Sequence, residues 1–230
     1  MSIFNYPALA VIPARGGSTR LKNKNIHPLG GKPLIRWSVE AIVASGCFDK
    51  VLVSTDSDEI FDAVADLPVQ RHCRPDHLAT TKATVLDAML NLMQEYDNKG
   101  YKYLSYFLPT CPFISERDII KGASLLNCET EETEFVVSMT EFTETIQLAC
   151  QMSGDYVLPV FDNLEQGITN SKFIKKYYKP SGAFYMGKWD AILEKKNFFK
   201  GNVRGIIIPE SRSVDINNIY DIKYAESILA

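Results

Sequence analysis

The chain has 230 residues, 46% of them hydrophobic, and a net charge of −3. This composition is typical of a folded globular protein and excludes disordered, collagen-like and disulfide-scaffold classes. The length fits one large domain or two small ones, and we expect a single domain over residues 1–230. The charge is unevenly distributed, because no Asp or Glu precedes Glu40. The same stretch contains the cations Arg15, Arg20, Lys22, Lys24, Lys32 and Arg36, which indicates that an anion binds there.

The sequence gives no sign of a membrane protein or of a zinc-binding cysteine motif. No apolar run approaches the ~18 residues of a membrane span, and no secretory leader precedes Arg15. The cysteines are widely spaced and never form a C-x-x-C pair, so we expect reduced thiols and a cytoplasmic protein. His27, His72 and His77 form no H-E-x-x-H pattern and are expected to be solvent-facing or hydrogen-bonded.

In the first third of the chain, strands and helices alternate. The apolar run Ala8–Ile12 is typical of a parallel strand that is covered on both faces. Apolar residues at helical spacing predict a helix over Pro33–Ala44, with the proline in its first turn. Val51–Val53 is predicted as the next strand, and Ser57–Ala65 as a short helix.

The alternation continues through the middle of the chain. Thr84-x-x-Asp87 resembles a capping box, which predicts that an amphipathic helix begins there. A strand is predicted over Tyr103–Leu108, followed by a helix that Ser115-x-x-Asp118 caps. That helix is expected to run to about Leu126, and Phe135–Ser138 returns as a strand.

The remainder is less regular. From about residue 140 to residue 180 the pattern degrades, which indicates an excursion that covers the site or packs against another subunit. Strands are expected over Ala183–Met186 and Gly205–Ile208, and a helix from about Ile219 to the end. This order predicts an α/β fold of βαβ units around a mostly parallel sheet. Ligands of such sheets bind at the carboxyl ends of the strands, so the loops after Ile12, Val53 and Leu108 are the candidate site.

The loop over residues 13–25 combines small residues with cations and has no carboxylate. Small residues let backbone N–H groups approach a ligand, and phosphate oxygens favour such a cationic loop. The segment is neither a Walker A loop nor G-x-G-x-x-G. A solvated basic face is the alternative. Nucleic-acid binding is not expected, because few aromatic residues lie among the charges.

Motifs along nearly the whole chain resemble, in order, those of the cytidylyltransferases that activate sialic acids and related nine-carbon 2-keto sugars. The motifs are Val11–Ser18, Lys24-Asn25, Gly31–Leu34, Ser54–Asp56, Arg74–Ala79, Leu108–Pro112, Pro180–Tyr185, Phe198-Phe199 and Ser213–Ile216. The resemblance implies a Rossmann-like nucleotidyltransferase domain with a dimerisation excursion, and therefore a homodimer. It also implies transfer of CMP from CTP to a 2-keto sugar acid, with release of pyrophosphate and with Mg²⁺ as the cofactor.

The resemblance assigns roles by motif position. Arg15, Lys24 and Asp215 are the expected catalytic residues. The nucleotide is expected to bind at Ala14, Arg15, Gly16, Gly17, Ser18, Lys24, Asn25 and Arg74. The sugar is expected at Leu108, Thr110, Lys172, Ser181, Tyr185, Phe198 and Phe199, and the metal at Asp215 and Asn217. For Phe198 and Phe199, core packing is the open alternative, and for Lys172 a solvated face.

The chain departs from the family pattern at several positions. Thr19-Arg20-Leu21 replaces the usual Lys after Gly-Gly-Ser and resembles instead the enzymes that activate an eight-carbon keto sugar, so Arg20 is a candidate for the missing charge. Leu108 and Ile114 stand where the sialic enzymes carry Gln and Arg. The expected arginine near residue 171 is absent, and Lys172, Lys175 and Lys176 are candidate substitutes.

The C-terminal motif differs most, because Asn217 replaces its second Asp. An amide can still ligate Mg²⁺ but contributes less charge. Three hypotheses follow. The first is an enzyme with a modified sugar pocket, for a legionaminic- or pseudaminic-type sugar. The second is a catalytically weak homologue that binds a nucleotide or nucleotide sugar, and the third is an enzyme for an eight-carbon keto sugar.

Overall fold

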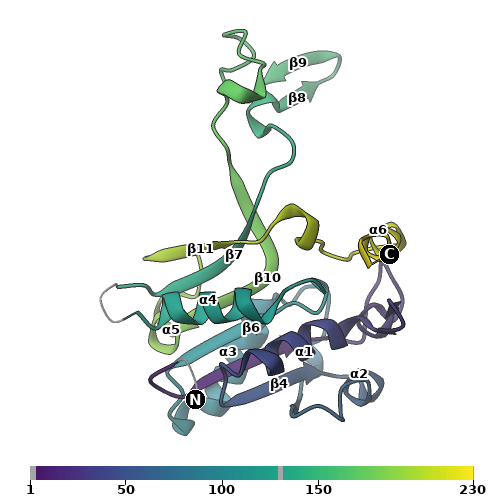
Figure 1. The fold of residues 1–230 in the computed structure, drawn as a ribbon, viewed down its shortest axis with the longest axis vertical. Helices are drawn as coiled ribbons and strands as arrows, with labels where there is room; N and C mark the ends of the chain where they lie inside the picture. The colour runs from purple at the N-terminus through teal and green to yellow at the C-terminus, as the bar shows by residue number, and fades with distance from the viewer. Residues whose placement is uncertain (1–3, 129–131, 230) are drawn as a thin grey trace.

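The computed structural model describes residues 4–128 and 132–229 and places a seven-stranded sheet at the centre of the molecule (Figure 1). The strands lie in the order β11-β7-β10-β6-β1-β4-β5. Their bounds are β1 Ala8–Pro13, β4 Lys50–Thr55, β5 Gln70–Cys73, β6 Tyr103–Phe107, β7 Phe135–Glu141, β10 Tyr178–Lys188 and β11 Val203–Ile207. β10 runs antiparallel to both of its neighbours, and the other pairs are parallel. The prediction of a mostly parallel α/β sheet is therefore confirmed.

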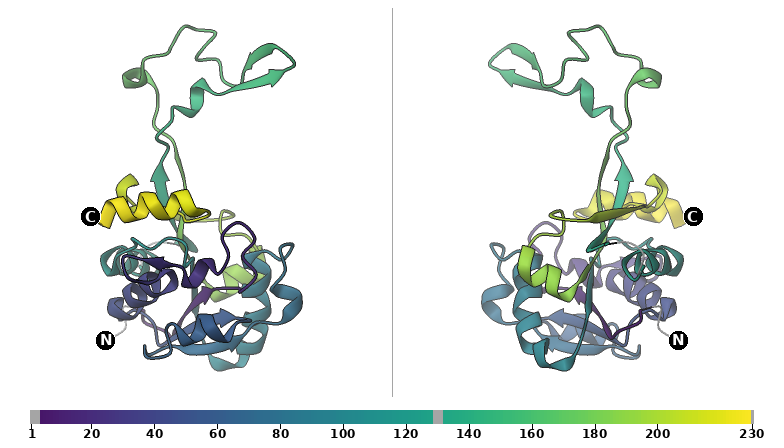
Figure 2. Two further views of the ribbon diagram at one scale, coloured as in Figure 1. Left: turned by 90° about the vertical axis from the view of Figure 1, so that its right-hand side faces the viewer. Right: turned by 90° about the vertical axis from the view of Figure 1, so that its left-hand side faces the viewer.

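Helices cover both faces of the sheet (Figure 2). One face packs against α1 Leu34–Ser45, α2 Asp58–Asp62 and α4 Glu116–Leu126, and the other against α3 Val85–Tyr96 and α5 Trp189–Lys195. The alternation of side chains along β1 makes this possible, since Ala8, Ala10 and Ile12 face the first layer while Leu9 and Val11 face the second. All of these β1 side chains are fully buried, which explains the continuous apolar run in the sequence.

The predicted capping boxes are confirmed. Thr84 accepts a hydrogen bond from the Asp87 N–H at 3.1 Å, and the Asp87 carboxylate accepts one from the Thr84 N–H at 2.8 Å. Ser115 and Asp118 make the same exchange at the start of α4. α1 begins at Leu34, one residue after the predicted proline, and ends at Ser45, where Gly46 caps it with a left-handed φ of 62°.

Other elements were missing from the prediction. β5 carries the sequence Gln70-Arg-His-Cys73, which lacks an apolar run because it is an edge strand. α5 follows β10 directly and was not predicted. α2 is shorter than the helix expected over Ser57–Ala65. It ends at Asp62, and the chain forms turns from Ala63 onward.

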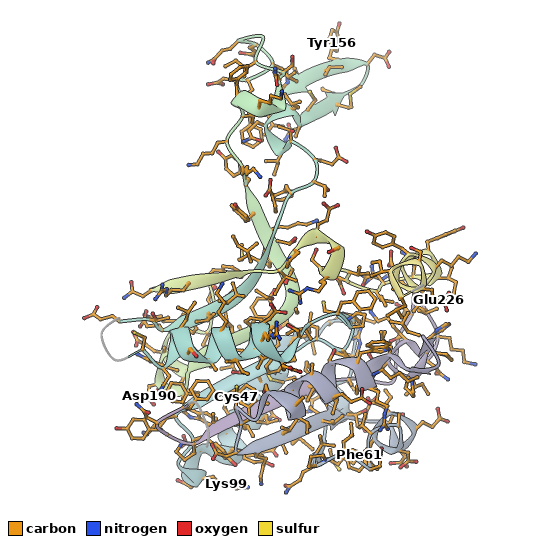
Figure 3. The ribbon with its side chains drawn as sticks, viewed as in Figure 1. Cys47, Phe61, Lys99, Tyr156, Asp190 and Glu226 are labelled. Carbon is orange, nitrogen blue, oxygen red and sulfur yellow. The ribbon has the colours of Figure 1, made fainter. Side chains whose placement is uncertain are left out.

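The excursion projects away from the sheet rather than folding over it (Figures 1 and 2). β7 and β10 extend toward it, and it carries a hairpin of β8 Cys150–Ser153 and β9 Tyr156–Pro159. Tyr156, at the turn of this hairpin, is 78% exposed and points into solvent (Figure 3). Covering the site within one chain is therefore excluded for this hairpin.

The C-terminal segment returns across the sheet to the N-terminal half. α6 Ile219–Leu229 packs on the small sheet of β2 Pro28–Leu29 and β3 Lys32–Pro33. This contact brings the chain just before α6 beside the loop after β1. In the described residues, 4–128 and 132–229, no helix is long and apolar enough to cross a bilayer.

Candidate active site

A pocket of about 290 Å³ opens at the carboxyl end of β1, where the loops after β1, β5 and β6 meet the C-terminal segment. This is the edge that the sequence predicted. Its lining residues are Pro13, Arg15, Ser18, Thr19, Arg20, Leu21, Lys24, Asn25, Arg74, Thr81, Ala83, Thr84, Val85, Leu108, Pro109, Thr110, Asp215 and Asn217. Residues separated by about 200 positions in the sequence therefore form one site.

Hydrogen bonds hold the loop after β1 in place. The Ala14 N–H donates to the Ser54 carbonyl at 2.9 Å and continues the β1–β4 pairing beyond the strand. The Asn25 amide donates to the Arg15 carbonyl at 2.9 Å, and the Gly16 N–H donates to the Asp56 carboxylate at 2.8 Å. A Cβ on Gly16 would lie 3.2 Å from the Ser57 Cβ, so this close approach favours glycine. Of the predicted nucleotide-binding residues, Ala14 and Gly16 hold the loop through these hydrogen bonds without lining the pocket, and Gly17 does not line it either.

Of the six cations in the N-terminal stretch, five fall into two groups, and the sixth, Lys22, does not line the pocket. Arg15, Arg20 and Lys24 line the pocket. Lys32 and Arg36 instead pair with Glu40 on α1, so they are not part of the anion site. The charge asymmetry of the sequence therefore overstates the cationic charge that the pocket holds.

Lys24 is half-buried at the edge of the pocket. Its Nζ donates to the Ile216 carbonyl at 3.1 Å and so ties the loop to the C-terminal segment. Burial lowers its pKa, the Asp215 carboxylate opposes this, and the nearby Arg20 and Arg15 cations add to the lowering. An anionic ligand would reverse this unfavourable balance.

Alternation along the C-terminal segment presents its polar side chains to the pocket. Val214 and Ile216 are buried against Leu29 and Leu34, so Asp215 and Asn217 face the opposite way and line the pocket. The Ile216 N–H also donates to the Thr110 carbonyl at 2.8 Å. Upstream, the Arg212 guanidinium pairs with the half-buried Asp118 carboxylate and donates to the Phe113 carbonyl at 3.2 Å.

Asn217 connects the loop cations to Asp215. Its Oδ1 accepts a hydrogen bond from Arg20 at 2.6 Å, and its Nδ2 donates to the Asp215 carboxylate at 3.0 Å. Asp221, at the start of α6, accepts from the Asn217 N–H at 2.7 Å and therefore caps the helix. No cluster of three or more metal-ligating His, Cys, Asp or Glu side chains occurs in the described parts of the chain. A divalent cation here would have Asp215 as its carboxylate ligand.

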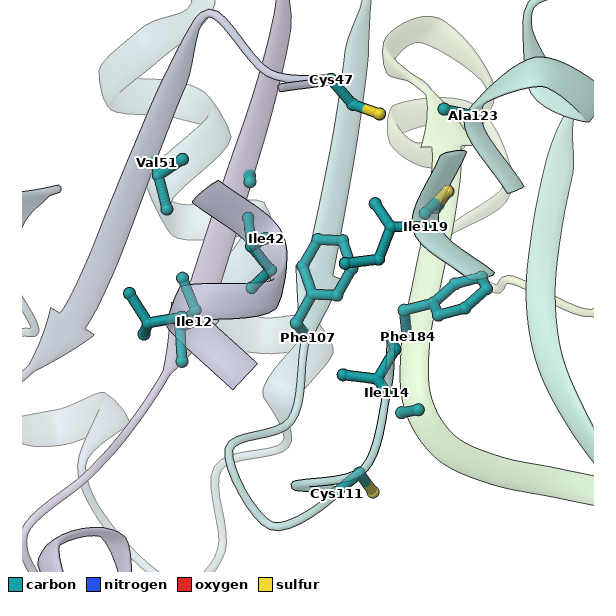
Figure 4. Close-up of a cluster of buried hydrophobic side chains, with 14 of the residues drawn as sticks. Ile12, Ile42, Cys47, Val51, Phe107, Cys111, Ile114, Ile119, Ala123 and Phe184 are labelled. Atoms are coloured by element: carbon teal, nitrogen blue, oxygen red, sulfur yellow. The ribbon is translucent and has the colours of Figure 1, made fainter. Parts of the chain in front are cut away.

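The predicted sugar residues do not all meet at the pocket. Leu108 and Thr110 line it, whereas Ser181 is buried behind it, with its hydroxyl accepting from the Ala183 N–H at 3.4 Å. Ile114 packs in the hydrophobic core beside Phe107 and Phe184 (Figure 4), so it cannot contribute to the pocket wall as the sequence comparison assumed.

The predicted aromatic sugar residues Tyr185, Phe198 and Phe199 do not line the pocket and instead form a cluster with Tyr106. Tyr185 stacks on Tyr106 with ring centroids 4.7 Å apart. Phe198 is only 5% exposed and packs edge-on against Tyr106 in the core, so core packing accounts for it. Phe199 is 53% exposed and meets Tyr185 at 6.3 Å, which leaves it accessible to a ligand. Lys172 lies on the excursion in a separate pocket with Glu141, and a single chain does not bring it to the site.

Sequence reasoning missed part of the pocket. Thr81, Ala83, Thr84 and Val85 line it, and the Arg15 guanidinium donates to the Thr80 carbonyl. The capping box at Thr84 was the available signal, because it places the N-terminus of α3 at this edge of the sheet, where backbone N–H groups favour anions. Asp56, which holds Gly16, was recognised as part of a motif but without a role.

Several known proteins are similar to this chain in sequence or in fold. The family model for cytidylyltransferases matches residues 9–154. The pseudaminic acid cytidylyltransferase of Campylobacter jejuni is 33% identical over 95% of this chain and 94% of its own length. The CMP-N,N'-diacetyllegionaminic acid synthase of Legionella pneumophila is 30% identical over 96% of this chain and 95% of its own length.

Another relative and two solved structures agree. The N-acylneuraminate cytidylyltransferase of Escherichia coli O18:K1:H7 is 31% identical over 96% of this chain, which spans 51% of that protein. A CMP:2-keto-3-deoxy-manno-octonic acid synthetase solved with CTP has the same fold, with a TM-score of 0.72, 15% identity and coverage of 97% of this chain and 98% of the other. The 4-diphosphocytidyl-2C-methyl-D-erythritol synthase of Anaerococcus prevotii gives a TM-score of 0.68 at 15% identity, covering 97% of this chain and 96% of the other. The chain therefore belongs to the cytidylyltransferase family.

Proposed function

We propose that this cytidylyltransferase transfers CMP from CTP to the anomeric hydroxyl of a nine-carbon 2-keto sugar acid of the sialic acid type, releasing pyrophosphate. The observation that carries the proposal is the convergence of Arg15, Arg20 and Lys24 with Asp215 in one pocket at the carboxyl end of β1. Relatives named for pseudaminic, legionaminic and N-acylneuraminic acid support the substrate class.

The chemistry requires positioning and charge neutralisation more than covalent participation by the protein. In our proposal the triphosphate lies against Arg15 and Lys24, with the N-terminus of α3 facing it. As the bond from the α-phosphorus to the leaving oxygen breaks, negative charge grows on pyrophosphate, and these cations stabilise it. The sugar hydroxyl attacks in line from the opposite side and loses its proton to solvent as the new bond to the α-phosphorus forms. We place the sugar near Leu108, Thr110 and the accessible ring of Phe199.

The donor set fits Mg²⁺. This ion takes one or two carboxylates together with phosphate oxygens and water, rather than a cage made only by protein. Asp215 supplies a carboxylate in the pocket. Asn217 lines the same pocket, but its amide oxygen accepts from Arg20 and its Nδ2 faces Asp215, so it would ligate the ion only after giving up these partners. When bound, Mg²⁺ would neutralise phosphate charge and orient the phosphates. Asp215, and Asn217 with its weaker oxygen, are the residues that would hold it.

We propose further that the protein works as a cytoplasmic homodimer. The excursion supports the proposal of a dimer. Its apolar residues Met152, Tyr156 and Phe173 are 66%, 78% and 80% exposed, and in a monomer they would remain in contact with water. In such a dimer Lys172 could approach a partner's pocket. Sedimentation of the full chain tests the dimer, and a monomer at all concentrations would refute it.

A pyrophosphate-release assay tests the activity. Purified protein is incubated with CTP and Mg²⁺ and with pseudaminic, legionaminic, N-acetylneuraminic or an eight-carbon keto sugar acid in turn. We expect release with one of the nine-carbon acids and none without a sugar. Release only with the eight-carbon acid would refute the substrate class. CTP binding with no release across the panel would favour the alternative of a catalytically weak nucleotide-binding homologue, for which Asn217 is the supporting observation.

A further inference from the structure

Arg74 is a buried cation with a hydrogen-bond donor left over. It follows β5, lines the pocket and is 8% exposed. Its Nε donates to the Ser54 hydroxyl at 3.3 Å, while its Nη2 is buried and has no hydrogen-bond partner among the described residues. Burial lowers the pKa of Arg74 to about 10, with Asp56 opposing and Arg15 adding to the lowering. Because Arg74 lines the pocket, the part of its guanidinium that faces the pocket can donate to an oxygen of a nucleotide bound there, whereas the enclosed Nη2 atom stays without a partner in the described part of the chain.

The orientation of Arg74 depends on a directed chain of hydrogen bonds. A guanidinium only donates, so the Ser54 oxygen accepts from Arg74 and its own proton is available for another acceptor. The Nδ1 atom of His72 lies 3.0 Å from that oxygen. The His72 Nε2 atom lies 3.3 Å from the Glu95 carboxylate. A histidine that accepts at Nδ1 and donates at Nε2 is neutral, and its two partners therefore select one tautomer.

Protonation of His72 would reverse the direction of the hydrogen bond between Ser54 and His72. Three groups face the His72 ring: Ser54 on β4, Glu95 on α3, and Arg74, which directly follows β5, the strand that carries His72. A protonated ring would donate to Ser54 from Nδ1, turn the hydroxyl proton away and place a second cation beside the buried guanidinium. Burial lowers the pKa of His72, the Glu95 carboxylate opposes this, and Arg74 adds to the lowering, so the neutral form is favoured.

We propose that His72 is a positioning residue for the nucleotide: in its neutral form it accepts the Ser54 proton, and Ser54 thereby aims the Arg74 guanidinium at CTP. This inference rests on the proposed function. It assigns a role in nucleotide affinity to a residue that does not line the pocket.

Two substitutions of His72 separate its role as a hydrogen-bond acceptor from the space that its ring fills. His72→Asn places an amide oxygen near the Nδ1 position, which accepts the Ser54 proton but does not titrate. His72→Phe keeps an aromatic ring and removes the acceptor, so the buried Ser54 hydroxyl loses its partner. CTP affinity is measured by calorimetry in metal-free buffer. At about pH 8 we expect His72→Phe to bind CTP about tenfold more weakly and His72→Asn to stay within about twofold of wild type.

The pH dependence is the readout that a purely structural role would not change. Between about pH 8 and pH 5.5 we expect the affinity of wild type, relative to His72→Asn, to fall about threefold as His72 protonates. Taking this ratio cancels the titration of CTP itself, whose terminal phosphate has a pKa near 6. The KM for CTP should follow the binding data, while the KM for the sugar and the melting temperature of His72→Asn should match wild type.

A second variant keeps the test valid if His72→Phe folds poorly. Ser54→Ala removes the link, so it should weaken CTP binding about tenfold and make the additional change His72→Asn silent at every pH. Equal CTP affinity of wild type and Ser54→Ala, or an unchanged pH dependence in His72→Asn, would overturn the inference and leave the proposed function intact. A wild-type protein that binds no CTP at any pH would overturn both.

Discussion

Replacing Asn217 by Asp tests how this pocket holds a cation. The amide now donates from Nδ2 to Asp215 at 3.0 Å and accepts from Arg20 at 2.6 Å. In Asn217→Asp, two carboxylates would face each other at about 3 Å, which costs about 1.4 kcal/mol at the dielectric of water and about 5 kcal/mol at an effective dielectric of ~20. Attraction to Arg20, at a similar distance, offsets much of this repulsion. We therefore expect the metal-free variant to fold with near wild-type stability.

A divalent cation converts the repulsion into attraction, because both carboxylates can ligate it. We expect the Kd for Mn²⁺, used as a spectroscopic substitute for Mg²⁺, to fall on the order of tenfold, which corresponds to ~1.4 kcal/mol. The gain should shrink as the pH falls, since the paired carboxylates raise the pKa of one of them and protons then compete with the metal. Electron paramagnetic resonance of free Mn²⁺ measures the affinity, and the Mg²⁺ dependence of pyrophosphate release gives a second reading.

The chain offers a matched control one residue away. Asn218 caps α6 by accepting from the Tyr220 N–H at 2.8 Å, and it does not line the pocket. Asn218→Asp keeps the cap, since Asp also favours this position, and adds the same charge. Equal Mn²⁺ affinity of Asn217→Asp and Asn218→Asp would refute a ligand role for residue 217 and would indicate that its carboxylate is held by Arg20 instead.

The other predictions concern the triphosphate, the C-terminal segment and the aromatic residues. Arg15→Ala should weaken CTP binding by about 1.5–3 kcal/mol in calorimetry, through loss of a charge-assisted contact. Arg212→Ala should lower the free energy of unfolding by about 1–2 kcal/mol at pH 7, a value reduced for partial exposure. Burial alone would raise the pKa of Asp118, but hydrogen bonds from Arg212 and Ser115 hold it below its usual value, so this stability is present above about pH 4 and is lost as the pH falls through the lowered pKa. Phe198→Ala should cost about 3–5 kcal/mol of stability, whereas Phe199→Ala should leave stability nearly unchanged and affect the KM for the sugar.

Each of these has a control. Arg71→Ala removes a cation that pairs with Asp58 outside the pocket, so equal CTP affinities of the Arg15 and Arg71 variants would contradict the phosphate assignment. The unfolding free energies of Arg212→Ala and wild type, measured with denaturant, should converge as the pH falls below the lowered pKa of Asp118. A difference that stays constant as the pH falls would show that the ion pair is not the cause. If Phe199→Ala destabilises the fold as much as Phe198→Ala, the assignment of the two rings to core and surface is wrong.

The elements that the sequence predicted share one property, a strong local signal. β1 and the first turns of α3 and α4 were predicted correctly, because an apolar run, helical spacing and a capping box each involve only residues close together in the sequence. β5 was missed because an edge strand needs no apolar run, and its partner β4 is what makes it a strand. Motifs placed the cationic loop after β1, Asp215 and Asn217 in the candidate site, and motifs report residue types without their contacts.

Contacts between distant segments were decided only by the tertiary structure. The sequence by itself determined the α/β class, the cationic loop and the loss of a carboxylate at Asn217. Only the fold paired Arg20 with Asn217, moved Ile114 and Phe198 into the core, and directed the excursion away from the pocket. The physical reason is that a side chain's role depends on which groups exclude water from it and which accept its protons. Across a sheet those groups come from strands and loops that the local sequence does not specify.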